Sequence, residues 1–140
     1  MKLRNKGFTF QEIMIVVAII AIMSVVSVFS YSGIAKKHRL EEARAALMEN
    51  HDFMTRYYAQ NYRYKKNSTT WPDLPVTHTE YFDIAFTSKA RAEPADRFRL
   101  RASPNARYVS ENRYIEIDQS HNIKLCTPKK TVRSAVCVSY

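Results

Sequence analysis

The chain has 140 residues, which allows one small domain beyond any terminal anchor. Its two glycines and five prolines exclude collagen-like and disordered low-complexity chains, and nine tyrosines with seven phenylalanines supply large apolar side chains for a core. The formal net charge of +9 makes nucleic acid a candidate partner.

The N-terminal region combines a basic leader with a long uncharged stretch. Residues 1–7 carry three basic side chains and no acidic one, and residues 13–35 carry no charge at all. As a helix this stretch is long enough to cross a bilayer, and the basic leader predicts a cytoplasmic N-terminus. An ordinary secretory signal is cleaved after its apolar core, whereas the only suitable small residue here, Gly7, precedes it.

Glu12 is the one carboxylate at the head of this apolar stretch. A carboxylate in hydrocarbon costs roughly 2.5 to 3.5 kcal/mol even on insertion scales, so it needs a partner, and an amine is the natural choice. The alternative is a plain single-pass anchor in which Glu12 is incidental.

One helix is predicted from about Phe8 to about Gln60. Its second half is amphipathic, because Leu40, Leu47 and Met54 recur every seven residues with polar side chains between them. The next stretch, 61–80, lacks a period and is rich in turn residues, so it is predicted to be a connecting loop. Its lone tryptophan, Trp71, is interpreted as an anchor of that loop.

Four strand-like segments follow, with turn signals between them. Short links favour antiparallel neighbours, and the last two segments alternate apolar and polar residues, which gives the sheet one apolar face. The sequence thus predicts an α+β fold, with the long helix packed on a three- or four-stranded antiparallel sheet. The expected strands are 81–87, 97–102, 113–118 and 122–126.

Basic side chains are concentrated in the C-terminal third. Arg97, Arg99 and Arg101 alternate with apolar residues, so a strand places all three on one face. Such a patch suits DNA phosphates, and Asn105 or Asn112 could read base edges. The alternative is a solvated sheet face or subunit contact, partly neutralised by neighbouring carboxylates. The remaining DNA-binding candidates are Arg107, Arg113, Lys129, Lys130 and Arg133.

The segment Gly7-Phe8-Thr9-Phe10-Gln11-Glu12, with its basic leader and apolar run, resembles the class III signal of the type IV pilin family. The resemblance implies that a prepilin peptidase cuts after Gly7 and methylates Phe8. It also implies that Glu12 pairs with the N-terminal amine of an adjacent pilin subunit during assembly. The expected location is the inner membrane of a Gram-negative bacterium, as a single-pass protein with a cytoplasmic N-terminus, and then the extracellular pilus.

Residues 44–75 are similar to the same region of neisserial-type minor pilins, which include a DNA-uptake receptor. This resemblance implies a minor pilin that binds double-stranded DNA in natural transformation. The alternatives are a filament subunit for adhesion, aggregation or twitching without DNA binding, and a type II secretion pseudopilin. The expected parts are a leader (1–7), a transmembrane and filament-core helix (8–35), an amphipathic helix half (36–60), a loop (61–80), and a sheet with a disulfide-bounded loop (81–140).

The two cysteines, Cys126 and Cys137, are expected to pair after export to a periplasm-like compartment. The alternative, two free thiols or half a metal site, lacks the further ligands that a closed metal shell needs, and the four histidines are scattered. No motif places a base beside a nucleophile or pairs two carboxylates. We therefore expect no enzyme, no metal and no cofactor.

Overall fold

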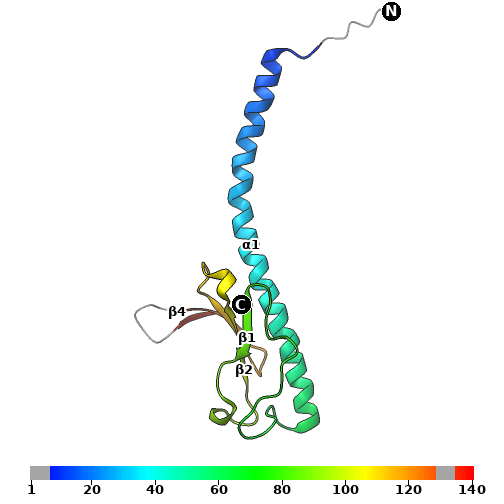
Figure 1. Cartoon of the computed structure of the whole chain (residues 1–140), viewed down its shortest axis with the longest axis vertical. Helices are drawn as coiled ribbons and strands as arrows, with labels where there is room; N and C mark the ends of the chain where they lie inside the picture. The colour runs from blue at the N-terminus through cyan, green and yellow to red at the C-terminus, as the bar shows by residue number, and fades with distance from the viewer. Residues whose placement is uncertain (1–6, 129–134) are drawn as a thin grey trace, which may run out of the picture. The chain divides into compact units, whose positions relative to one another are not determined.

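The computed structural model of the protein describes residues 7–128 and 135–140, except for the side chains of residues 26–30 and 32. The chain divides into two compact units, Met1–His38 and Arg39–Tyr140. Over the described residues the elements are one long helix, five strands and two short 3₁₀ turns. Figure 1 shows these elements. The helix α1 is Phe10–Asn61, and the turns are η1 (Ala90–Ala92) and η2 (Ala106–Tyr108).

The start of α1 is set by a reciprocal pair of hydrogen bonds between Thr9 and Glu12. The Glu12 carboxylate accepts from the Thr9 backbone N–H at 2.9 Å and from its hydroxyl at 3.0 Å, while the Glu12 N–H donates to Thr9 Oγ1 at 3.3 Å. This arrangement is a capping box, which satisfies N–H groups that have no partner inside the helix. It explains why the helix begins at Phe10.

The apolar side chains of the first unit are exposed within this chain. They include Phe10, Ile13, Val17, Ile20 and Met23. No helical segment among the described residues combines the length and apolar character of a bilayer span. The expected membrane segment, 8–35, contains residues 26–30 and 32, whose side chains lie outside the described part.

The sheet of the second unit is an antiparallel meander in the order β1-β2-β3-β4-β5. Figure 1 colours it from green at β1 towards red at the C-terminus. The helix and antiparallel sheet are as predicted, and four strands overlap the expected segments. The bounds are β1 Phe82–Phe86, β2 Arg99–Pro104, β3 Tyr114–Asp118, β4 Ile123–Pro128 and β5 Ala135–Ser139.

The strand β5 was not predicted. Four of its five residues are exposed, so its sequence shows no clear apolar face, and pairing with β4 is what makes it a strand. Within that pairing Cys126 lies opposite Cys137, and the two form a disulfide, which confirms the predicted bond.

The core lies between the second half of α1 and one face of the sheet. Leu40, Leu47 and Met54 are buried there, as their heptad spacing predicts, and they meet buried apolar side chains of the strands. Burying each such side chain stabilises the fold by about 1.5 to 3 kcal/mol. The strand residues in this core include Ile84, Leu100, Ile115, Ile117 and Ile123.

One buried polar side chain fixes the loop between α1 and β1 against the helix. Asn50 is fully buried, accepts from the Val76 N–H at 3.0 Å and donates to the Val76 carbonyl at 2.6 Å. Both polar ends of the amide are therefore satisfied, as burial requires. The loop is consequently held at its middle and not only at its ends.

Candidate nucleic-acid interface

Two surfaces of the second unit carry basic side chains, and the first is the sheet face turned away from the helix. Arg99 and Arg101 lie on this face, because they alternate with the buried Leu100 and Ala102. Arg101 is already engaged: its guanidinium bonds Glu116 at 2.7 and 2.8 Å and lies 4.3 Å from the centre of the Tyr114 ring. Most of its charge is compensated by that carboxylate.

Arg113 is compensated in the same way. Its guanidinium bonds the nearly buried Glu111 carboxylate at 2.6 and 2.8 Å. The hydrogen bonds from Arg113 hold the pKa of Glu111 below its ordinary value, and the same bonds raise the pKa of Arg113. This ion pair stabilises the turn before β3 and leaves little net charge for a phosphate.

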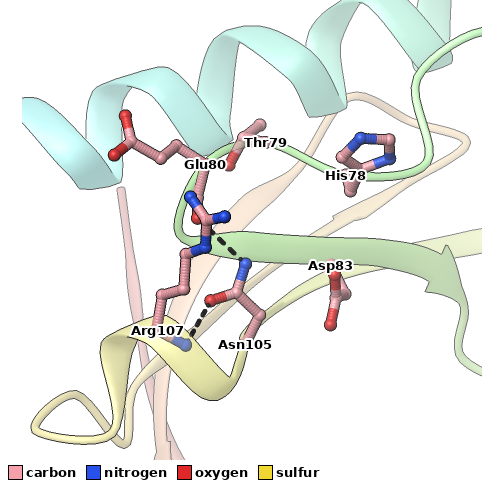
Figure 2. Close-up of a pocket in the computed structure, with 6 residues that line it drawn as sticks. All are labelled: His78, Thr79, Glu80, Asp83, Asn105 and Arg107. Atoms are coloured by element: carbon pink, nitrogen blue, oxygen red, sulfur yellow. Dashed lines mark hydrogen bonds between the residues drawn. The ribbon is translucent and has the colours of Figure 1, made fainter.

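The exposed Arg97, Arg99 and Arg107 have no carboxylate partner within the described part of the chain. Arg107 lines a cleft of about 520 Å³ with Asn105, Glu80 and Asp83. Figure 2 shows that Asn105 is held on both sides: it accepts from the Arg107 backbone N–H at 2.9 Å and donates to the Glu80 carbonyl at 3.1 Å. Its amide is thus occupied, and the two acidic side chains oppose phosphate binding in this cleft.

Three further DNA-binding candidates, Lys129, Lys130 and Arg133, lie outside the described residues. Asn112 is exposed on the turn before β3.

The second basic surface, which the sequence analysis missed, is formed by two loops. We call it the loop platform and define it by Arg63 and Lys65 from the loop after α1, and Lys89 and Arg91 from the connection between β1 and β2. A cleft of about 460 Å³ is lined by Arg63, Lys65, Asn67, Ser68, Arg91 and Ala95. An adjoining cleft of about 410 Å³ is lined by Thr69, Trp71, Lys89, Ala90 and Arg91. The clefts share Arg91, and neither lining includes an acidic side chain.

The two loops of the platform are bonded to each other. The Tyr64 N–H donates to the Ala95 carbonyl at 2.9 Å, and the Trp71 indole N–H donates to the Ser88 carbonyl at 2.8 Å. The Trp71 ring also stacks on Phe86 at 4.4 Å, which confirms its interpretation as a loop anchor. Because these bonds fix the loops before any ligand arrives, binding would cost little conformational entropy.

Lys65 forms the floor of the larger cleft. It is 8% exposed, donates from Nζ to the Glu93 carbonyl, and its ammonium lies 5.9 Å from the centre of the Trp71 ring. No carboxylate is bonded to it among the described residues. A buried cation with only a carbonyl and a ring as neighbours favours the approach of an anion.

A long N-terminal helix whose second half packs on an antiparallel meander with a C-terminal disulfide is the architecture of a type IV pilin. Residues 2–28 match the prokaryotic N-terminal methylation motif. Residues 30–126 match the family described as type IV minor pilin ComP, DNA uptake sequence receptor, and the chain therefore belongs to the ComP family of minor pilins. Members of a pilin family are structural subunits, and the chain is not an enzyme.

One solved structure agrees with this assignment, and a second is reported beside it. The solution structure of the minor DNA-uptake pilin ComP from Neisseria subflava is 28% identical, with a TM-score of 0.58 over 73% of this chain and 95% of that one. The global fold of ComP from Neisseria meningitidis is 29% identical, with a TM-score of 0.46 over 69% of this chain and 89% of that one. No curated protein matches the chain.

Proposed function

We propose that this minor pilin binds double-stranded DNA through the loop platform during natural transformation. The observation that carries the proposal is the pair of adjoining clefts with four basic side chains and no acidic one. The family description names a DNA uptake sequence receptor, and the relative from Neisseria subflava is described as a DNA-uptake pilin. Both descriptions fit a surface built for phosphate.

The connection between β1 and β2 extends this surface. It leads directly into Arg97 and Arg99, which are exposed and without a carboxylate partner in the described part. These two arginines therefore complete the proposed interface. The other candidates are ranked below them: Arg101 and Arg113 are paired with carboxylates, and Arg107 shares its cleft with acidic side chains.

Fluorescence anisotropy with labelled duplex DNA tests this proposal on the full chain in zwitterionic detergent micelles. We expect binding that weakens steeply with salt, and the variant Arg91→Ala should lower the slope of log K against log salt by about one. Removing Arg63, Lys89 and Arg91 together should weaken binding roughly 100-fold. Lys124→Ala removes one exposed cation from β4 and should change affinity less than about twofold.

Undetectable binding of the unmodified protein at low salt would refute the proposal. The chain would then be a filament subunit for adhesion, aggregation or twitching. The compensated arginines of the sheet face would suit the subunit contact that such a role requires.

For assembly, we propose that a prepilin peptidase removes residues 1–7 and methylates Phe8. Before assembly the chain then resides in the inner membrane of a Gram-negative bacterium with its N-terminus in the cytoplasm, and it later joins other pilin subunits in an extracellular pilus. The exposed apolar side chains of the first unit support this, since they need lipid or neighbouring subunits to cover them. Gly7, Phe8 and Glu12 line one small cleft, so the cut site and the carboxylate lie close together.

Two variants test the assembly proposal. Gly7→Arg should block leader removal, and an unchanged processed mass in that variant would place the cut elsewhere. Glu12→Ala should enter the membrane but not the pilus, because the neighbouring amine loses its carboxylate. Normal recovery of Glu12→Ala in sheared pili would refute the role of the carboxylate.

A further inference from the structure

Two residues other than glycine have a positive φ in the described part of the chain. They are Tyr62, with a φ of 55°, and His121, with a φ of 62°. This left-handed conformation is unfavourable for side chains with a Cβ, and it is uncommon for a bulky ring. An outlier of this kind calls for a reason at each position.

The backbone of Tyr62 ends the long helix. Its N–H donates to the Tyr58 carbonyl at 2.7 Å, in the single bond of a left-handed C-terminal cap. Glycine is the usual residue at this position, because it adopts a positive φ without strain. The end of the helix therefore does not require a tyrosine.

Packing does not require one either. The Tyr62 side chain is 84% exposed. By contrast, Tyr64 lies two residues further on and packs against Tyr58 at 4.5 Å and Phe98 at 4.7 Å between ring centres. Tyr64 belongs to the fold, whereas Tyr62 presents its ring to solvent from a strained backbone.

The neighbours of Tyr62 indicate what the ring could contact. Arg63, the next residue, lines the larger cleft of the loop platform together with Lys65 and Arg91. Successive Cα atoms are about 3.8 Å apart, so the exposed ring starts beside a cationic cleft. Aromatic rings beside cations are common where proteins bind single strands, and on duplex DNA apolar side chains insert between base steps while cations contact the backbone.

We propose that Tyr62 is a stacking residue of the loop platform, inserting its ring at a base step of the duplex and partly unstacking it while Arg63 and Arg91 hold the adjoining phosphates. The inference rests on the proposed DNA binding. The fixed backbone at the helix end orients the ring before DNA arrives, and this keeps the entropic cost of the contact low.

Replacing the Tyr62 side chain distinguishes a role in DNA binding from a role in folding. Tyr62→Gly relieves the positive φ, so we expect a higher melting temperature, by roughly 4 °C or more for a domain of this size. In the anisotropy assay we expect the same variant to bind duplex DNA roughly 5- to 100-fold more weakly. The salt slope should be unchanged, because no phosphate contact is lost.

Two further variants exclude simpler explanations. Tyr62→Asn tolerates the left-handed backbone without the added freedom of glycine, so it should lose as much affinity as Tyr62→Gly. Tyr62→Phe keeps the ring and should keep the affinity within about twofold. His121→Gly serves as a control for DNA binding: it relieves a similar φ in the turn between β3 and β4, although it also removes a ring contact with His51 at 4.7 Å, and it should leave DNA affinity unchanged.

The outcomes distinguish this inference from the proposal on which it rests. If the unmodified protein does not bind DNA, the proposed function fails. If it binds and Tyr62→Gly binds equally well, or if Tyr62→Gly lowers the salt slope as Arg91→Ala does, the stacking role is wrong. Duplex DNA with 2-aminopurine adds a direct readout: fluorescence that rises with the unmodified protein but not with Tyr62→Asn supports a base contact.

Discussion

The sheet face and the loop platform both carry arginines, but they use the charge differently. On the sheet face, Arg101 bonds Glu116, and in the turn before β3, Arg113 bonds Glu111, so the charge of both arginines contributes to the fold. In the platform, Arg63 and Arg91 line clefts without acidic side chains, and Lys65 is buried beneath them. The number of basic residues therefore does not locate a phosphate site; the absence of compensating carboxylates does.

The largest expected effect concerns the covalent bond of the sheet. Replacing Cys126 and Cys137 with serine should lower the free energy of unfolding by about 3 kcal/mol. The disulfide closes a short loop and so restricts the unfolded chain, and without it the unfolded chain gains conformational entropy. Thermal unfolding followed by circular dichroism measures this. If DNA binding, assayed below the new melting temperature, is unchanged, the platform works independently of this end of the sheet. A clear loss would assign a role to the residues between the cysteines.

The next effect concerns the bonds that join the two loops. Trp71→Ala should lower the free energy of unfolding by about 2 kcal/mol, because it removes the stack on Phe86 and the bond to Ser88. It should also weaken DNA binding by separating the loops. Trp71→Phe keeps the stack and serves as the control. Full DNA affinity in Trp71→Ala would show that the platform does not depend on this anchor.

A smaller, pH-dependent effect is expected for the ion pair between Glu111 and Arg113 in the turn before β3. The pKa of Glu111 is lowered in the folded state, so the pair stabilises the protein fully above the unfolded pKa of about 4.3 and loses this contribution as the pH falls through the folded pKa. Arg113→Ala should cost about 1 kcal/mol at pH 7 and progressively less in acid. Urea unfolding from pH 7 to pH 3 measures it, and a pH-independent difference would contradict this account.

The smallest expected change in DNA affinity tests the comparison between the sheet face and the loop platform most directly. Arg101→Ala should change DNA affinity less than about twofold, because the Glu116 carboxylate already neutralises the guanidinium. Arg99→Ala, two residues earlier on the same face but without such a partner, should weaken binding more and lower the salt slope. Equal losses in the two variants would mean that DNA breaks the Arg101 ion pair.

Much of the fold follows from local patterns in the sequence. The heptad of Leu40, Leu47 and Met54 predicts the buried face of α1, and alternation around Ile115 and Ile117 predicts β3. The strand β5 could not be predicted from such patterns, because its side chains are mostly exposed and only its pairing with β4 defines it.

The candidate site was less accessible to sequence reasoning. Arg63, Lys65 and Lys66 form a visible basic run, but nothing local shows that Lys89 and Arg91 meet it. Long-range bonds, such as that from Tyr64 to Ala95, create the platform. Similarly, the sequence predicts a strand stripe of Arg97, Arg99 and Arg101, of which β2 holds Arg99 and Arg101 while Arg97 precedes the strand. The cross-strand neighbour that neutralises Arg101 depends on the register of β2 and β3.

The capping box at the start of α1 bears on the state of the Glu12 carboxylate before a subunit joins a pilus. The proposed cut after Gly7 would leave Thr9 and its amide in place, so both hydrogen bonds to Glu12 would persist in the processed chain. Under the assembly proposal, the Glu12 carboxylate of an unassembled subunit is bonded to Thr9, and in the pilus it would exchange these donors for the terminal amine of a neighbouring subunit. The carboxylate would then be hydrogen-bonded both before and after assembly, so pilus growth would never require an unpartnered charge in the lipid.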